Sequence, residues 1–141
     1  MKRWKKILLG AAGGVAAVLL AYVGYVFAAY DRLEDCIELT VEHNSEEQAE
    51  AGVPYTLVSY NVGFGAYSAD YSFFMDGGTE SRAYSAQAVR DNLSGAMEEV
   101  QSLHPDFVFL QEVDQHATRS HHVDETKLVR EALTGLSSSF A

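Results

Sequence analysis

The sequence predicts an α/β domain that follows an N-terminal transmembrane helix. Three observations lead to this prediction: an apolar stretch without charges near the N-terminus, two short apolar strands about 50 residues apart, and an amphipathic helical pattern between them. A strand, a helix and a second strand in this order are typical of a crossover unit with parallel strands. With 141 residues, the chain has room for one modest domain.

Residues 1–30 are expected to form a basic flank and a membrane anchor. The stretch Ile7–Tyr30 contains no charged residue, and as a helix its 24 residues would be about 36 Å long, enough to span a bilayer. Lysines and an arginine precede it at Lys2, Arg3, Lys5 and Lys6. By the positive-inside rule, we expect a single-pass protein of the cell membrane with a cytoplasmic N-terminus and an extracytoplasmic domain. A cleaved signal peptide is the alternative.

The chain beyond the anchor is strongly acidic. From Asp31 onward it has six Lys or Arg residues and twenty Asp or Glu residues, a formal charge of −14. Such a surface lacks the clustered basic residues on which nonspecific nucleic-acid binding depends. Within the juxtamembrane segment 31–54, residues 36–42 alternate between apolar and polar side chains, which predicts a half-buried strand. Residues 45–52 are polar and predict a loop.

Residues 55–141 are expected to form the domain itself. Pro54 leads into a strand over 55–60, and the long loop 63–82 carries five aromatic residues that either pack against the sheet or contact a substrate. A helix is predicted over 83–103, followed by a strand over 106–114. The apolar stripe of that helix comprises Val89, Leu93, Met97, Val100 and Leu103.

The C-terminal part is expected to contain a polar loop, a short helix and the start of another strand. The loop covers 115–124, the helix covers 125–133 and ends before Gly135, and residues 136–141 begin the strand. Two or three strands and one long helix are too few to cover both faces of a sheet. We therefore expect the front portion of a larger domain.

Two polar residues stand where the strands are expected to end. Asn61 follows the first strand, and Glu112 lies near the end of the second. Because parallel strands end at the same edge of a sheet, these oxygen ligands are expected to lie together and to form half of a magnesium site. A bound magnesium ion would offset charge on a phosphoryl group during hydrolysis. The alternatives are an asparagine that only forms a turn and a glutamate that only faces water.

Two sequence motifs surround these residues: Ser59-Tyr60-Asn61-Val62-Gly63 and Phe107-Val108-Phe109-Leu110-Gln111-Glu112-Val113. Together they resemble the endonuclease/exonuclease/phosphatase superfamily, which has the deoxyribonuclease-like fold. Residues 73–78 and 120–122 further resemble a membrane-anchored bacterial branch of it. The resemblance implies the first portion of a two-sheet α/β sandwich, an incomplete domain, with magnesium as the cofactor and Asn61 and Glu112 at the metal site.

The same resemblance limits what these residues are expected to do alone. The catalytic histidine of the family, its D-x-N element and its closing Asp-His pair are expected beyond residue 141, so we assign no catalytic residue. Neither His116 nor His121 stands in such a motif. Arg119 and His122 follow Glu112 by a short loop, and they either line a phosphate pocket or are solvated loop residues.

Two functions follow from these expectations. The first is the N-terminal fragment of a membrane-anchored, metal-dependent phosphoester hydrolase that needs a C-terminal half for activity. The second is a noncatalytic, membrane-tethered interaction module or a truncated relic. The resemblance does not choose among DNA, inositol phosphates, sphingomyelin and other phosphoesters. The acidic composition and the anchor favour a lipid headgroup or a small phosphoester over duplex DNA.

Overall fold

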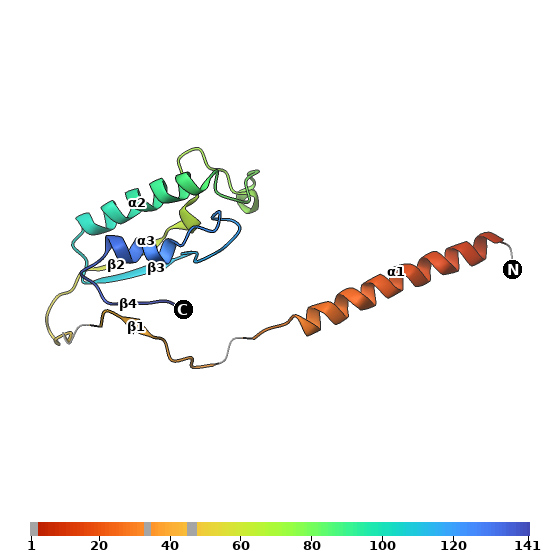
Figure 1. Ribbon diagram of the computed structural model, residues 1–141, viewed down its shortest axis with the longest axis horizontal. Helices are drawn as coiled ribbons and strands as arrows, with labels where there is room; N and C mark the ends of the chain where they lie inside the picture. Colours follow the sequence, from red (N-terminus) through yellow and green to blue (C-terminus); the bar gives the residue numbers. More distant parts are fainter. Residues whose placement is uncertain (1–2, 33–34, 45–47) are drawn as a thin grey trace. The chain divides into compact units, whose positions relative to one another are not determined.

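The computed structural model describes residues 3–32, 35–44 and 48–141. Contacts between residues divide the chain into two compact units, an N-terminal unit Met1–Glu38 and a C-terminal unit Leu39–Ala141. The C-terminal unit contains both strands and helices, in agreement with the predicted α/β class (Figure 1).

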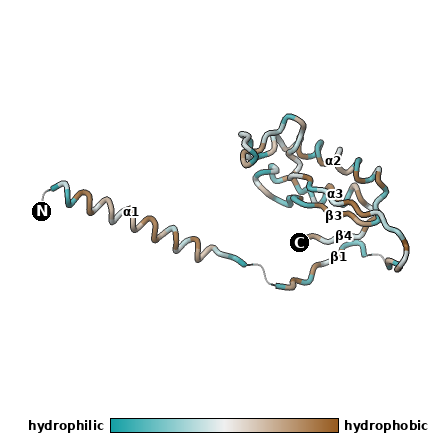
Figure 2. The backbone as a smooth tube through the Cα atoms, turned by 180° about the vertical axis from the view of Figure 1, so that it is seen from behind, coloured by the Kyte–Doolittle hydropathy of each residue, from teal (hydrophilic) through white to brown (hydrophobic). Residues whose placement is uncertain are grey.

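The N-terminal unit is dominated by one long helix, α1 (Arg3–Ala28). Its 18-residue window has a mean hydropathy of 2.1 and none of it is buried, so the helix is long and apolar enough to cross a membrane. Figure 2 shows hydrophobic residues along most of its length. A signal sequence would meet the same criteria of length and composition. The helix begins within the basic flank, because a helix can extend past the apolar residues into water.

The C-terminal unit is built around the parallel strands β2 (Leu57–Asn61) and β3 (Phe107–Gln111). Their register pairs Leu57 with Phe107 and Asn61 with Gln111. Between them the chain forms α2 (Ala86–Ser102), so the predicted order of strand, helix and parallel strand is observed. The carboxyl ends of both strands therefore lie at one edge of the sheet.

Helix α2 begins after a serine cap and covers one face of the sheet. Ser85 has an extended backbone, and its Oγ accepts the N–H of Ala88 at 3.0 Å, which satisfies a donor in the first turn. Four residues of the predicted stripe are buried: Val89, Leu93, Met97 and Val100. Leu103 is 51% exposed, because the helix ends at Ser102 and the chain turns away there.

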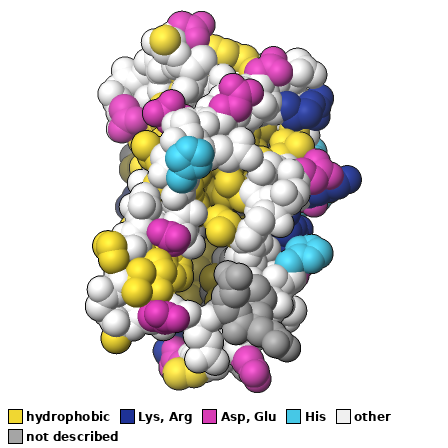
Figure 3. All heavy atoms as spheres, turned by 90° about the vertical axis from the view of Figure 1, so that its left-hand side faces the viewer, with side chains coloured by type: hydrophobic (Ala, Val, Ile, Leu, Met, Phe, Trp, Pro, Cys, Tyr) yellow, Lys and Arg dark blue, Asp and Glu magenta, His cyan; other side chains and the backbone are white. Residues whose placement is uncertain are grey.

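Helix α3 (Glu125–Ala132) packs beside α2 over the same face. Val58 of β2 and Val108 of β3 point into the shared core. The opposite face of the sheet carries exposed apolar side chains, namely Leu57, Phe107 and Phe109. In Figure 3, hydrophobic side chains reach the surface among acidic ones. Among the described residues, the helices of this unit therefore cover one face of the sheet.

The long loop after β2 is folded around Phe64, which is 1% exposed. Its short helical turns are η1 (Gly63–Gly65) and η2 (Phe74–Asp76). The rings of Tyr67, Tyr71 and Phe73 meet the Phe64 ring edge to face at centroid distances of 6.0, 6.3 and 6.0 Å. Most of the loop aromatics thus pack against one another.

The strand predicted over 36–42 is largely absent. Only β1 (Val41–Glu42) is a strand, and it pairs antiparallel with β4 (Ser138–Ser139), within the segment expected to begin a strand. Cys36 has a φ of 62°, which is incompatible with a strand, and residues 36–42 are all exposed. An alternating pattern without a neighbouring strand over its whole length cannot form a ladder. Of the predicted loop 45–52, residues 45–47 lie outside the described residues.

Candidate functional site

Asn61 and Glu112 lie side by side at the carboxyl edge of the β2–β3 sheet. Asn61 is the last residue of β2 and pairs in register with Gln111, the last residue of β3. Glu112 follows directly after Gln111. The Nδ2 of Asn61 donates a hydrogen bond to Glu112 Oε1 at 2.9 Å. The parallel register thus brings together the two residues that the sequence analysis selected as metal ligands.

Sharp backbone turns hold both side chains at the strand ends. The Oδ1 of Asn61 accepts the N–H of Gly63 at 2.9 Å, a local bond that orients the amide. Glu112 has a φ of 56°, in the left-handed region that non-glycine residues seldom adopt. The N–H of Phe64 donates to the carbonyl of Glu112 at 2.9 Å and joins the two turns.

Arg119, from the loop after β3, links two carboxylates. Its Nη1 donates to Glu112 Oε2 at 3.2 Å, while its Nε and Nη2 donate to the carboxylate of Asp114 at 3.0 and 2.9 Å. The guanidinium also lies 4.3 Å from the centre of the Phe64 ring, a cation–π contact. Its hydrogen bonds to Asp114 raise the pKa of Arg119, which therefore stays protonated.

Glu125, the first residue of α3, is a buried acid next to Asp114. Its Oε2 accepts the N–H of Asp114 at 2.9 Å, and its own N–H donates to the Asp114 carbonyl at 2.9 Å. This reciprocal pair closes the loop that carries Arg119. Burial is the main cause that raises the pKa of Glu125 to about 7. Among the described residues, its Oε1 has no hydrogen-bond partner.

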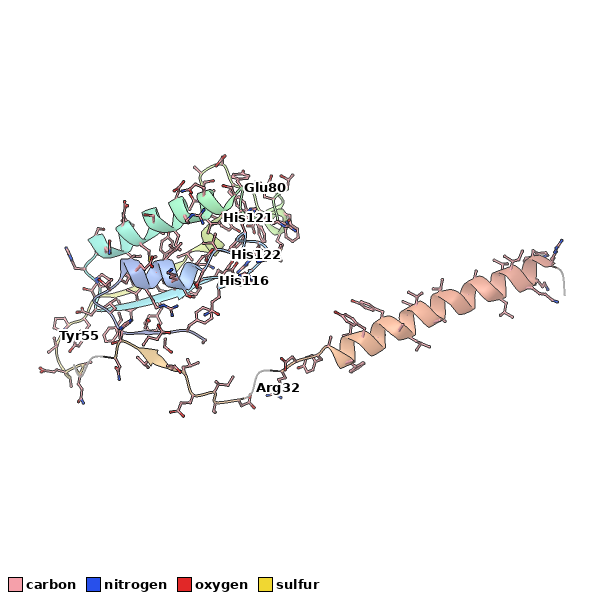
Figure 4. The ribbon with its side chains drawn as sticks, viewed as in Figure 1. Arg32, Tyr55, Glu80, His116, His121 and His122 are labelled. Atoms are coloured by element: carbon pink, nitrogen blue, oxygen red, sulfur yellow. The ribbon has the colours of Figure 1, made fainter. Side chains whose placement is uncertain are left out.

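His122 lies in the same loop but is held by other groups. Its Nδ1 is 3.1 Å from the carbonyl of His116, and the two rings lie 4.6 Å apart between centroids. His121 Nε2 lies 2.6 Å from the carbonyl of Ala83. Figure 4 shows the three histidines at one end of the C-terminal unit. Among the described residues, Arg119 contacts Glu112 and no hydrogen bond joins His122 to that carboxylate.

Three members of this site were not predicted from the sequence, namely Phe64, Asp114 and Glu125. Phe64 and Asp114 were read only as parts of a loop and a strand, and Glu125 only as the start of a helix. Their roles depend on the closure of the loop after β3, which no local pattern encodes. The available signals for the Asp114–Arg119 pair were an acid two residues after Glu112 and an arginine five residues after that acid.

The oxygen atoms of Asn61 and Glu112 fit a small share of a magnesium site. Magnesium takes oxygen ligands and usually keeps several waters. The Glu112 side chain is 42% exposed, and each of its oxygens accepts one hydrogen bond, so lone pairs remain for a cation. Within the described residues, no group of three or more His, Cys, Asp and Glu side chains is arranged to hold a metal ion. No protein-family model, curated protein or solved structure matches the chain.

Proposed function

We propose that the C-terminal unit is the N-terminal part of a metal-dependent phosphoester hydrolase of the endonuclease/exonuclease/phosphatase type. The observation that carries this proposal is the contact between Asn61 and Glu112, 2.9 Å apart, at the ends of adjacent parallel strands. Open α/β sheets bind ligands at this edge. The motifs around both residues, from the sequence, support the same family.

We further propose that these residues form the first portion of a two-sheet sandwich. The uncovered face of the β2–β3 sheet supports it, because Leu57, Phe107 and Phe109 leave apolar surface exposed there. A second sheet packed on that face would bury it. The general base and the remaining metal ligands would come from that further part, so we expect the 141 residues alone to be inactive.

Each residue of the site has a role in the proposed chemistry. A bound divalent cation would offset the negative charge that builds on a phosphoryl group during hydrolysis. Glu112 would supply a carboxylate ligand. Asn61 points its Nδ2 at Glu112 and its Oδ1 at the Gly63 N–H, so its amide would have to turn over for Oδ1 to become a second ligand. Arg119 carries guanidinium donors beside the same edge, suited to a phosphate oxygen. For His122, whose Nδ1 lies 3.1 Å from the carbonyl of His116, a phosphate contact would use Nε2.

We also propose an orientation for helix α1 in the membrane. Helix α1 would be a single-pass anchor in the cell membrane, with the basic N-terminus in the cytoplasm and the C-terminal unit outside. The acidic composition of the chain beyond α1, together with the anchor, favours a lipid headgroup or a small phosphoester as substrate over duplex DNA.

The proposal is tested by metal binding to the full chain in detergent micelles. Free Mn²⁺ is measured by its electron paramagnetic resonance signal, because Mn²⁺ accepts the same oxygen ligands as Mg²⁺. We expect a Kd on the order of 1 mM, raised about tenfold or more by Glu112→Gln. The control is Glu131→Gln, the same change at an exposed acid of α3. Equal Kd values for both variants would contradict the proposal.

A noncatalytic interaction module is the second candidate, favoured by the exposed apolar face of the sheet. Both candidates expect the 141 residues alone to be inactive, so activity of this chain would exclude one of them. If the full chain hydrolyses bis-p-nitrophenyl phosphate with Mg²⁺, and Glu112→Ala abolishes this, the noncatalytic function is excluded.

A further inference from the structure

Arg119 makes two unequal ion pairs. Toward Asp114 it uses Nε and Nη2, a forked contact with distances of 3.0 and 2.9 Å. Toward Glu112 it uses Nη1 alone, at 3.2 Å. The Asp114 side chain is 10% exposed, whereas that of Glu112 is 42% exposed. A forked, part-buried contact is stronger than a single, more exposed one, because water screens the latter more.

Two further contacts of Arg119, and the fixed backbone of its partner Asp114, keep Arg119 where it is. Its guanidinium stacks on the buried ring of Phe64, and its carbonyl accepts the N–H of Ala83 at 2.9 Å. Asp114 is in turn fixed through its backbone by the reciprocal hydrogen bonds with Glu125. The pair with Glu112 can therefore break while the guanidinium stays in place.

We propose that Arg119 is a built-in counter-ion of Glu112, which competes with a divalent cation for that carboxylate and remains bound to Asp114 when the cation takes its place. The inference rests on the proposed metal site. Without a cation, the guanidinium donates to Glu112 and occupies its Oε2. When a cation binds, Arg119 gives up Nη1 and keeps its fork on Asp114. The released donor then faces the edge where a phosphate oxygen would bind.

An arginine that competes with the cation and an arginine that only supports Glu112 have opposite effects on the affinity for the cation. If Arg119 only held Glu112 in position, its loss would weaken cation binding. If it competes, its loss strengthens cation binding. The pair with Glu112 is partly exposed, so we expect Arg119→Met to lower the Kd for Mn²⁺ about threefold to tenfold.

The matched control is Arg130→Met on α3. Arg130 has a similarly exposed side chain, 30% against 38% for Arg119, and among the described residues it makes one ion pair, with Glu42 at 3.1 Å. Both substitutions remove one positive charge, so the net charge of the chain changes alike, but Arg119 contacts Glu112 whereas Arg130 contacts Glu42. The difference between the two Kd values thus measures the effect of a guanidinium placed at Glu112. The full chain in detergent micelles is used, and far-UV circular dichroism checks that both variants are folded.

A second measurement needs no variant. In the wild-type chain, titration with diamagnetic Mg²⁺ should shift the ¹³Cδ resonance of Glu112 and leave the Nε–H resonance of Arg119 unshifted, because Nε stays on Asp114. Loss of the Nε–H resonance during that titration would overturn the inference. So would a Kd for Arg119→Met equal to or above that of Arg130→Met. Mn²⁺ binding that Glu112→Gln leaves unchanged would instead overturn the proposed metal site.

Discussion

Replacing the buried acid Glu125 by glutamine should stabilise the C-terminal unit at neutral and alkaline pH. The Glu125 side chain is fully buried, and its Oε2 accepts the N–H of Asp114, a bond that a glutamine oxygen can also accept. Burial raises the pKa of this carboxyl from 4.5 to about 7, against the opposing effects of the Asp114 N–H and Arg119. Folding therefore requires either a buried charge or a retained proton.

The size of the effect follows from the shift in the pKa of Glu125. The folded state binds the proton more tightly than the unfolded state, so the stability due to the protonated acid is fully present below about pH 4.5. It is lost as the pH rises to about 7. At 1.36 kcal/mol per pKa unit, the loss amounts to about 3 kcal/mol. Glutamine stays neutral, so the variant keeps its stability over this range.

Urea unfolding of the full chain in detergent micelles at pH 5 and pH 8 checks this expectation, with near-UV circular dichroism as the probe. Because part of the loss has already occurred at pH 5, we expect Glu125→Gln and wild type to differ by about 2.5 kcal/mol more at pH 8 than at pH 5. Glu131→Gln, at an exposed position of the same helix, is the control and should show no such pH dependence. The pKa of Asp124 is lowered by its hydrogen bond from Thr126, so its contribution is lost only as the pH falls further, and it is common to all variants. A difference between Glu125→Gln and wild type that is the same at both pH values would refute the reasoning.

The remaining predictions concern two glycines, one in the turn η1 and one in α2, and the orientation of α1. Gly65 has a φ of +61°, and a Cβ there would lie 2.7 Å from Val89 Cγ1, so Gly65→Ala should destabilise the unit by about 1–3 kcal/mol. Gly95 of α2 faces open space, so Gly95→Ala in the same urea experiment should stabilise it by about 0.5–1 kcal/mol, and the reverse order would contradict the geometry. For the orientation, Cys36 is exposed and is the only cysteine of the sequence, so a membrane-impermeant maleimide should label it in intact cells. A chain with Cys36→Ser and Lys2→Cys should stay unlabelled, and labelling of that chain instead would reverse the proposed topology.

The order of elements could be predicted because it depends on local periodicity. The stripe of α2 was visible as spacings of three and four, and the structure buries four of its five members. The boundary at Ala86 depends on the side-chain cap of Ser85, which shortens the helix relative to the predicted 83–103. The strand over 36–42 failed because a strand needs a partner, and β4 offers only two residues.

The candidate site could be predicted only in the part that the sheet determines. Two parallel strands with residues at their ends are enough to bring Asn61 beside Glu112. The contacts of Arg119 depend instead on the loop after β3, which is closed by Asp114 and Glu125, and on a ring that arrives from the loop after β2. Pairings between loops are set by tertiary packing and leave no periodic signal.

The backbone that follows the two strands adopts an unfavourable conformation, which is not expected where residues only support the fold. Glu112 and Phe64 both have a positive φ, at 56° and 45°, which costs of order 1–3 kcal/mol for each residue. Neither carries the flexibility of glycine, so the surrounding bonds must compensate, among them the one from the Phe64 N–H to the Glu112 carbonyl. Such strain tends to be kept where it positions a functional side chain.

The charges around Arg119, like the backbone strain, support a functional role of Glu112. Glu112 and Asp114 share one guanidinium, so two negative charges are offset by one positive charge at the exposed edge. Glu125 adds a third carboxyl nearby, which is charged only above about pH 7. A cation at Glu112 would remove this imbalance, whereas replacing Glu112 by glutamine would remove it without a cation. Strained backbone and uncompensated negative charge therefore coincide at one carboxylate, and this is why Glu112, rather than Asn61, is the residue on which the proposed function depends.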